Sequence, residues 1–209
     1  MKKTLVFSIL ITLLSFTGHT QDIQFGLKTG LNFSRFSSDD TSINQMSYNR
    51  TAFQIGGLVA FKVSDNLSIQ PELYYSSEGG SFKDTEVEEN SIVHFNTNVN
   101  TNYISLPIMV KYFVNKSVFL EAGAQMDFLV SANAKTTISN NFEAEVEEIE
   151  DFQDGLDSNS YGVGIGIGYQ AANGIFINTR YVLGLSDITK NEFTTIKNNG
   201  FHFSVGFML

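Results

Sequence analysis

The sequence predicts an all-β fold, an eight-stranded antiparallel up-and-down transmembrane β-barrel. Three observations predict it. Apolar side chains alternate with small or polar ones in eight segments of about ten residues, the length that crosses a bilayer as a tilted strand. The connections between these segments are alternately long and short. The second face of the segments, rich in glycine and charge, is too poor in apolar groups for a soluble core, so we expect the apolar face to meet lipid.

The clearest segment is the last one, residues 200–209. Its apolar side chains, Phe201, Phe203, Val205, Phe207 and Leu209, alternate with His202, Ser204, Gly206 and Met208. Because successive side chains of a strand point to opposite faces, one face of this strand is wholly apolar. We expect this strand to close the barrel by pairing with the first one, residues 24–34.

The remaining strands follow in chain order with the same alternation. They are expected at residues 52–63, 67–77, 103–113, 118–132, 161–170 and 175–186. Pro71 lies inside the third strand, where a proline normally restricts a strand to an edge or a bulge. Short turns are expected at 64–66, 114–117 and 171–174, and longer polar connections at 35–51, 78–102, 133–160 and 187–199. Residues 142–152 fit helical and strand periodicity alike, so their secondary structure stays open.

The connections and the first twenty residues predict the cellular location. Barrels of the outer membrane have an even number of strands, short periplasmic turns and longer extracellular loops. Residues 1–20 combine Lys2 and Lys3, an apolar run too short for a secure membrane helix, and small residues Gly18 and Thr20. They predict a cleaved signal peptide, the alternative being an uncleaved anchor helix, and leave residues 21–209 as one outer-membrane β-barrel domain. With no cysteine in the chain, neither a lipoprotein signal nor a disulfide framework is expected.

Four segments carry a resemblance to a known family. They read FGLKTGLNF at 25–33, LSIQPELYY at 67–75, YISLPIMVKY at 103–112 and RYVLGL at 180–185. Over essentially the whole length after the signal, the chain resembles the small PorT-like outer-membrane β-barrel proteins. The resemblance implies an outer-membrane location and an eight-stranded barrel. It implies no settled activity, because the link of one member to protein export does not extend to the group.

Charged side chains occupy the inward positions of several strands. The alternation places Lys28, Lys62, Lys111, Arg180, Glu72, Glu121 and Asp127 in the lumen. An eight-stranded barrel is just wide enough for side chains to fill, and buried charges must pair. We therefore expect an internal network of salt bridges and hydrogen bonds; the alternative is a gated path for protons or ions.

Two motifs suggest chemistry that their context does not support. The glycines of residues 162–168 lack the spacing and the following helix of a nucleotide-binding loop, so we expect them to make room for bulky neighbours. His202 and Ser204 form the His-x-Ser pair known from lipid A deacylases, but here both face the lumen without an identifiable carboxylate. We expect no enzyme activity, no cofactor, and no catalytic, cofactor-binding or metal-binding residues.

The acidic residues of the long connections indicate which partners to expect. The formal net charge is −9, and the surplus acids lie in the long connections, for example at 143–157. Such a charge argues against nucleic acid as a partner. We expect a monomer that contacts the lipid bilayer and lipopolysaccharide, where Ca²⁺ or Mg²⁺ would bridge weakly to phosphates, and a protein partner that the sequence does not identify. The expected role is structural or in surface interaction; the alternatives are a narrow channel or export-machinery component and, third, a lipid-modifying enzyme.

Overall fold

The computed structural model describes residues 23–39, 41, 44, 47–88, 91–140, 146–151, 153–190 and 195–209. These residues form nine strands: β1 (Ile23–Ser38), β2 (Ser47–Lys62), β3 (Leu67–Glu88), β4 (Ser91–Phe113), β5 (Val118–Asn140), β6 (Val146–Asp151), β7 (Asn159–Gln170), β8 (Ile175–Gly184) and β9 (Ile196–Met208). A short 3₁₀ helix, η1 (Gln153–Gly155), follows β6. Among the described residues, no helix has the length and apolar character needed to span a membrane.

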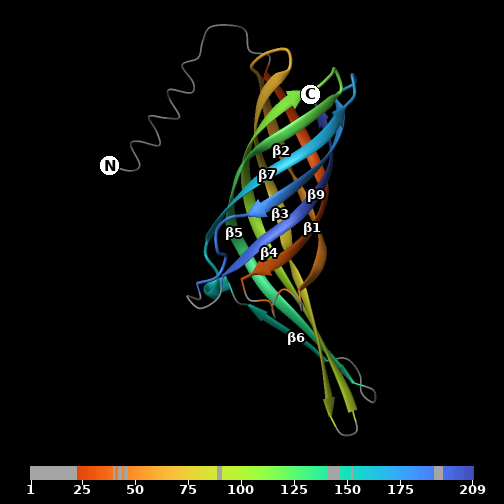
Figure 1. The fold of residues 1–209 in the computed structure, drawn as a ribbon, viewed down its shortest axis with the longest axis vertical. Coiled ribbons are helices and arrows are strands. Elements are labelled where there is room, and N and C mark those ends of the chain that lie inside the picture. The colour runs from red at the N-terminus through yellow and green to blue at the C-terminus, as the bar shows by residue number, and fades with distance from the viewer. Residues whose placement is uncertain are drawn as a thin grey trace, which may run out of the picture.

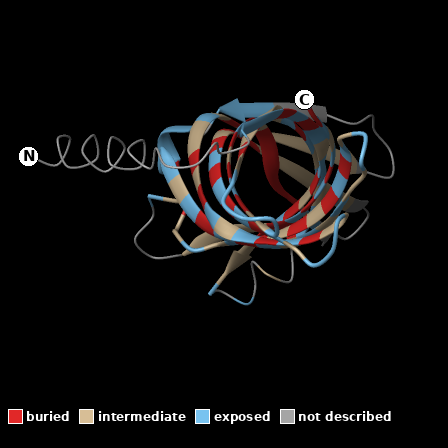
Figure 2. Cartoon of the chain, turned by 90° about the horizontal axis from the view of Figure 1, so that it is seen from above, coloured by how far each residue is buried: buried red, intermediate tan, exposed pale blue. Residues whose placement is uncertain are grey.

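Eight of these strands close into a ring. Each pairs antiparallel with its neighbour in the order β1, β2, β3, β4, β5, β7, β8 and β9, and β9 pairs back onto β1. The closing register runs from Gly26↔Met208 to Ser38↔Ile196. The predicted barrel and its closure by residues 200–209 are thereby confirmed, and Figure 2 shows the ring from above.

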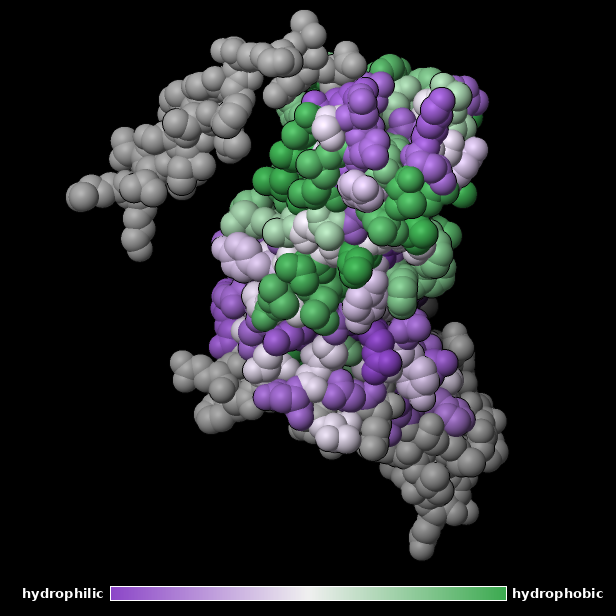
Figure 3. Space-filling view, turned by 45° about the horizontal axis from the view of Figure 1, so that its top comes forward, coloured by the Kyte–Doolittle hydropathy of each residue, from purple (hydrophilic) through white to green (hydrophobic). Residues whose placement is uncertain are grey.

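Burial alternates along the strands of the ring, as Figure 2 shows. In β9, Phe201, Phe203, Val205 and Phe207 are each about half exposed, whereas His202 and Ser204 are buried. Figure 3 shows the outcome as a hydrophobic band between hydrophilic ends. The outer face is the apolar one, which is the arrangement of a barrel that meets lipid rather than water.

The connections predicted at 78–102 and 133–160 contain strands, which corrects the sequence-based boundaries. β3 continues to Glu88 and β4 begins at Ser91, and the two pair in one register as far as Glu88↔Ser91. β5 continues to Asn140 and pairs with β6 from Asn133↔Asp151 to Ile138↔Val146. Asparagine and glutamate have low strand propensity, but hydrogen bonding to neighbouring strands overrides that preference.

These segments project beyond the ring as a four-stranded sheet, here called the extension: residues 77–88 of β3, 91–102 of β4, 133–140 of β5, and β6. Figure 1 shows it at the end of the molecule opposite the short turns and the C-terminus. Within residues 142–152, whose periodicity was ambiguous, the structure describes 146–151, and they form strand β6. The remaining residues of that segment lie outside the described part.

Smaller corrections apply at other strand ends. β1 runs to Ser38 and β2 starts at Ser47, so the connection predicted at 35–51 is shorter; likewise β9 starts at Ile196 inside the one predicted at 187–199. β8 ends at Gly184, two residues before the predicted end. Pro71 lies within β3 opposite Ile108, and the register with β4 is the same on both sides of it.

The strands become irregular where the ring passes into the extension. The β2–β3 register shifts between Asn49 and Gln54, and the β4–β5 register shifts between Asn102 and Tyr103. Gly79 has a φ of 133°, and a Cβ there would lie 2.1 Å from the carbonyl oxygen of Val99. Bulges and such a glycine bend strands, so they mark the junction of the two regions.

Candidate functional site: the lumen

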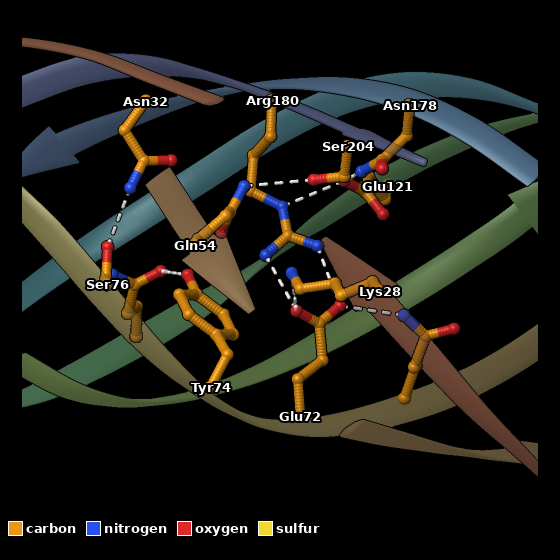
Figure 4. Close-up of polar contacts among 12 residues, drawn as sticks. Lys28, Asn32, Gln54, Glu72, Tyr74, Ser76, Glu121, Asn178, Arg180 and Ser204 are labelled. Carbon is orange, nitrogen blue, oxygen red and sulfur yellow. Dashed lines mark hydrogen bonds and ion pairs between the residues drawn. The ribbon is translucent and has the colours of Figure 1, made fainter. Parts of the chain in front are cut away.

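An ion cluster occupies the middle of the lumen. Arg180 of β8 donates two hydrogen bonds to Glu72 of β3, from Nη2 to Oε1 at 2.8 Å and from Nη1 to Oε2 at 3.2 Å. Its Nε donates to Oε1 of Glu121 on β5 at 2.8 Å. Lys28 of β1 approaches Oε2 of Glu72 at 2.5 Å. The guanidinium group of Arg180 thus joins β8 to β3 and β5, and Glu72 adds β1 through Lys28, as Figure 4 shows.

Neutral side chains add to the coordination of the two carboxylates, although Glu121 Oε2 has no hydrogen-bond partner among the described residues. Gln70 Nε2 donates to Glu72 Oε1 at 2.7 Å, and Asn178 Nδ2 donates to Glu121 Oε1 at 2.8 Å. The side chains of Glu72 and Glu121 are wholly shielded from solvent, and that of Arg180 is 2% exposed. Charges so buried are tolerated because they are paired and hydrogen-bonded. The predicted internal network is confirmed.

An apolar plug lies between this cluster and the short turns. Leu58, Ala60, Phe176 and Met208 form one buried cluster. Phe119 at the start of β5 is fully buried, and Lys111 places its Nζ 4.0 Å from the centre of that ring. The ammonium group of Lys111 therefore lies against aromatic faces, a favourable arrangement for a desolvated cation.

Glycines provide the space for these side chains. A Cβ on Gly168 would lie 2.2 Å from Cζ of Phe119, and one on Gly166 would lie 2.8 Å from Oε1 of Glu121. A Cβ on Gly164 would lie 3.1 Å from Cδ of Arg180. The prediction that residues 162–168 make room for bulky lumen neighbours is confirmed.

The other half of the lumen, toward the extension, is held by neutral hydrogen bonds and two more acids. Tyr74 donates from its hydroxyl to Oε1 of Gln125 at 2.8 Å, and Gln125 Nε2 donates to Asp127 Oδ1 at 2.8 Å. Glu78 accepts from the Ser76 hydroxyl at 2.7 Å and from Asn198 Nδ2 at 2.6 Å. These bonds link strands β3, β5 and β9 across the barrel.

His202 and Ser204 are both in the lumen, but no hydrogen bond joins them. The Ser204 hydroxyl accepts a hydrogen bond from Gln54 Nε2 at 3.0 Å. The nearest carboxylate oxygen to His202 Nε2 is that of Glu78, at 3.8 Å. A nucleophile needs a base within hydrogen-bond reach, and this pair does not provide one.

Most of the predicted lumen residues are where the alternation placed them. Lys28, Glu72, Lys111, Glu121, Asp127 and Arg180 are all buried. Lys62 is the exception, and that prediction is wrong: its side chain is 45% exposed and lies 3.5 Å from Asp65. Lys62 is the last residue of β2, at the rim, where its side chain reaches solvent instead of the lumen.

The same alternation of side chains also places residues in the lumen that were not predicted there. Phe119, Phe176 and Met208 occupy inward positions, so the apolar plug follows from the same parity as the charges. Glu78 falls within the connection predicted at 78–102, so its approach to His202 in the lumen was not predicted. Of the acidic residues in the connections, Glu150, Asp151, Asp154 and Asp157 are described and exposed. Within the described part, no three acidic or histidine side chains gather as metal ligands.

Comparisons with solved structures return barrels of bacterial outer membranes. The attachment invasion locus protein Ail of Yersinia pestis is 12% identical; the match covers 89% of this chain and 98% of that one, with a TM-score of 0.47. Neisserial surface protein A (NspA) is 11% identical, with 88% and 96% covered and a TM-score of 0.47. The outer membrane protease OmpT of Escherichia coli is 10% identical, with 93% and 99% covered and a TM-score of 0.35.

No curated protein matches the chain in a sequence comparison. A family model does match, over residues 17–190: the outer membrane protein β-barrel domain. This match spans most of the ring and the whole described extension. The chain therefore belongs to the family of outer-membrane β-barrel domain proteins, and its location is the outer membrane.

Proposed function

We propose that this protein is a surface-interaction protein in which the ring is a closed anchor and the extension is the part that engages a partner. The observation that carries the proposal is the cluster of Arg180, Glu72 and Glu121, which joins three strands across the lumen without solvent exposure. An eight-stranded barrel filled in this way leaves no room for an open channel. The short turns of such barrels are periplasmic, which supports an extension that lies outside the cell.

The extension supplies the features of a binding module. It has four strands, ends on β6 as an edge strand, and displays exposed Ile149 and Glu150 there. The edge of a sheet presents backbone groups to which another chain can add a strand. The exposed acidic side chains of Glu150 and Asp151 on β6 favour a partner segment with basic residues. The closure of the ring within one chain supports a monomeric anchor.

A narrow channel or a component of an export machinery is the second candidate. Buried acceptors in the lumen have no donor among the described residues: Asn32 Oδ1, Gln54 Oε1 and Asn178 Oδ1. A thin file of water would satisfy such groups. A lipid-modifying enzyme is not proposed, because His202 and Ser204 face the lumen without a shared hydrogen bond.

Single-channel recording in planar bilayers separates these candidates. The wild-type protein is expected to give no discrete conductance steps, and Glu72→Gln is expected to behave in the same way. Discrete steps in the wild type that vanish in Glu72→Gln would establish a conducting lumen and overturn the anchor proposal. Loss of a lipid A modification in His202→Ala cells would overturn the absence of catalysis.

A further inference from the structure

The outer face of the extension is polar, although it continues the lipid-facing face of the ring. On β4 the outward positions change from Leu106 and Ile104 to a ladder of asparagines, Asn102, Asn100, Asn98 and Asn96. β3 keeps one register with β4, so its outward positions beyond Tyr75 include Ser81 and Lys83, which pair with Asn98 and Asn96. Because the register of β3 with β4 is the same on both sides of the junction, this polar face continues the face of these two strands that meets lipid. It therefore faces the headgroup layer of the outer leaflet.

A groove of about 650 Å³ lies on this face, where β2, β3 and β4 leave the ring. It is lined by two cations, an aromatic ring and hydrogen-bonding side chains: Tyr48, Arg50, Ser81, Lys83, Asn96 and Asn98. Tyr48 is about half exposed and Lys83 is exposed. The groove thus combines positive charge with the side chains that bind sugar hydroxyls.

Hydrogen bonds inside the groove orient its donors. Arg50 donates from Nη1 to the carbonyl oxygen of Glu78 at 3.0 Å, which holds the guanidinium against β3. Ser81 donates to Oδ1 of Asn96 at 3.2 Å, so the amide nitrogen of Asn96 remains a donor. Lys83 Nζ lies 5.4 Å from the centre of the Tyr48 ring. Anchored donors lose less freedom when they bind an anion than mobile ones do.

The charges of the groove stand out against the rest of the protein. The chain carries a net charge of −9, yet among the described residues no ion pair involves Arg50 or Lys83. Glu78, the acid next to Arg50 in the fold, directs its carboxylate to Ser76 and Asn198 on the lumen side. Two cations that form no ion pair with an acidic side chain in the described part of the chain, beside the lipid band, provide a place for a phosphate group.

We propose that this groove binds the phosphorylated sugar headgroup of lipopolysaccharide in the outer leaflet. Arg50 and Lys83 contact the phosphate, and Tyr48, Asn96 and Asn98 contact the sugars. This contact is direct, unlike the cation-bridged contact through acidic connections that the sequence suggested. It depends on the extension lying outside the cell but not on what β6 binds, so it can fail while the proposed partner role stands.

The test measures binding of fluorescent lipopolysaccharide to the full-length protein in phosphatidylcholine nanodiscs. Each cation near an anionic headgroup contributes about 1 kcal/mol, so Arg50→Gln with Lys83→Gln is expected to weaken binding about thirtyfold. Lys62→Gln with Lys116→Gln removes two exposed cations at the opposite end of the barrel and is expected to leave binding unchanged. Arg50→Lys with Lys83→Arg retains the charge and is expected to bind within a few-fold of the wild type.

Each outcome of this experiment decides the proposal. Heat-modifiable mobility in electrophoresis verifies that all variants are folded. The charge-retaining variant shows whether substitution at these two positions weakens binding without any loss of charge. Equal binding by the wild type and by Arg50→Gln with Lys83→Gln would overturn the proposal. Undiminished binding of dephosphorylated lipopolysaccharide to the wild type would also overturn it, because the cations would then have no phosphate to contact.

Discussion

The ring and the extension share strands β3, β4 and β5, but their faces are built differently. In the ring, the outer face is apolar and the inner face holds paired charges and a plug. In the extension, the outer face carries asparagines and cations, while the inner face begins with the stacked rings of Phe36 and Phe82, 6.0 Å apart. The same strands thus present an apolar outer face in the ring and a polar outer face in the extension. The alternation of inward and outward side chains continues, while the residue types at the outward positions change.

The largest effect is expected at the centre of the ring. Arg180→Ala leaves Glu121 buried without a cation and Glu72 with Lys28 as its remaining one, and breaking a buried pair in this way costs about 3–5 kcal/mol of unfolding free energy. The measurement is equilibrium unfolding by urea in lipid vesicles, followed by circular dichroism. Lys62→Ala, at the rim, should change the unfolding free energy by less than about 0.5 kcal/mol. Equal losses in the two variants would contradict the buried cluster.

A smaller effect is expected where glycine makes room for the plug. Gly168→Ala places a Cβ 2.2 Å from Cζ of Phe119 and 2.7 Å from the carbonyl oxygen of Ile177, and such overpacking costs about 1–3 kcal/mol. Gly155→Ala is the matched control, because nothing lies within 4 Å of its added Cβ.

A double-mutant cycle refines the same prediction. Phe119→Leu removes the ring atoms that the new Cβ would meet, so the cost of Gly168→Ala should fall when both changes are combined. Strictly additive costs in the same urea unfolding assay would show that Phe119 is not the neighbour that matters.

The smallest effect on the ring is expected from shortening the extension. In a variant with residues 81–98 replaced by a two-residue Asn-Gly turn, β3 and β4 keep their pairing within the ring, so the unfolding free energy of the barrel should change by less than about 1 kcal/mol. Loss of folded barrel in electrophoresis would mean that the ring needs the extension to form.

The sequence predicted the ring because the alternation is strict there. Lys28, Glu72 and Arg180 were placed in the lumen by parity alone, and β9 was identified as the closing strand. Their mutual contacts could not be derived, since which strands face each other across a barrel depends on strand tilt and stagger. Lys62 was misplaced because parity does not show where a strand reaches the rim.

The extension was not predicted, for the opposite reason. Residues 94–102 alternate as strictly as any ring strand, with asparagine at each outward position from 96 to 102, but both faces are polar enough to resemble a loop. Strand formation there is due to the neighbouring strands rather than to local propensity. The approach of Glu78 to His202 in the lumen was not predicted for this reason, because residue 78 fell in a predicted connection.

The contrast between a closed ring and an accessible extension is tested most directly by thiol accessibility. The chain has no cysteine, so single-cysteine variants give an unambiguous signal. Ser204→Cys places a thiol in the lumen and Glu150→Cys places one on β6. In intact cells, a membrane-impermeant thiol reagent is expected to label residue 150 rapidly and to leave residue 204 unlabelled. Comparable labelling of both positions would contradict a closed ring with an accessible extension.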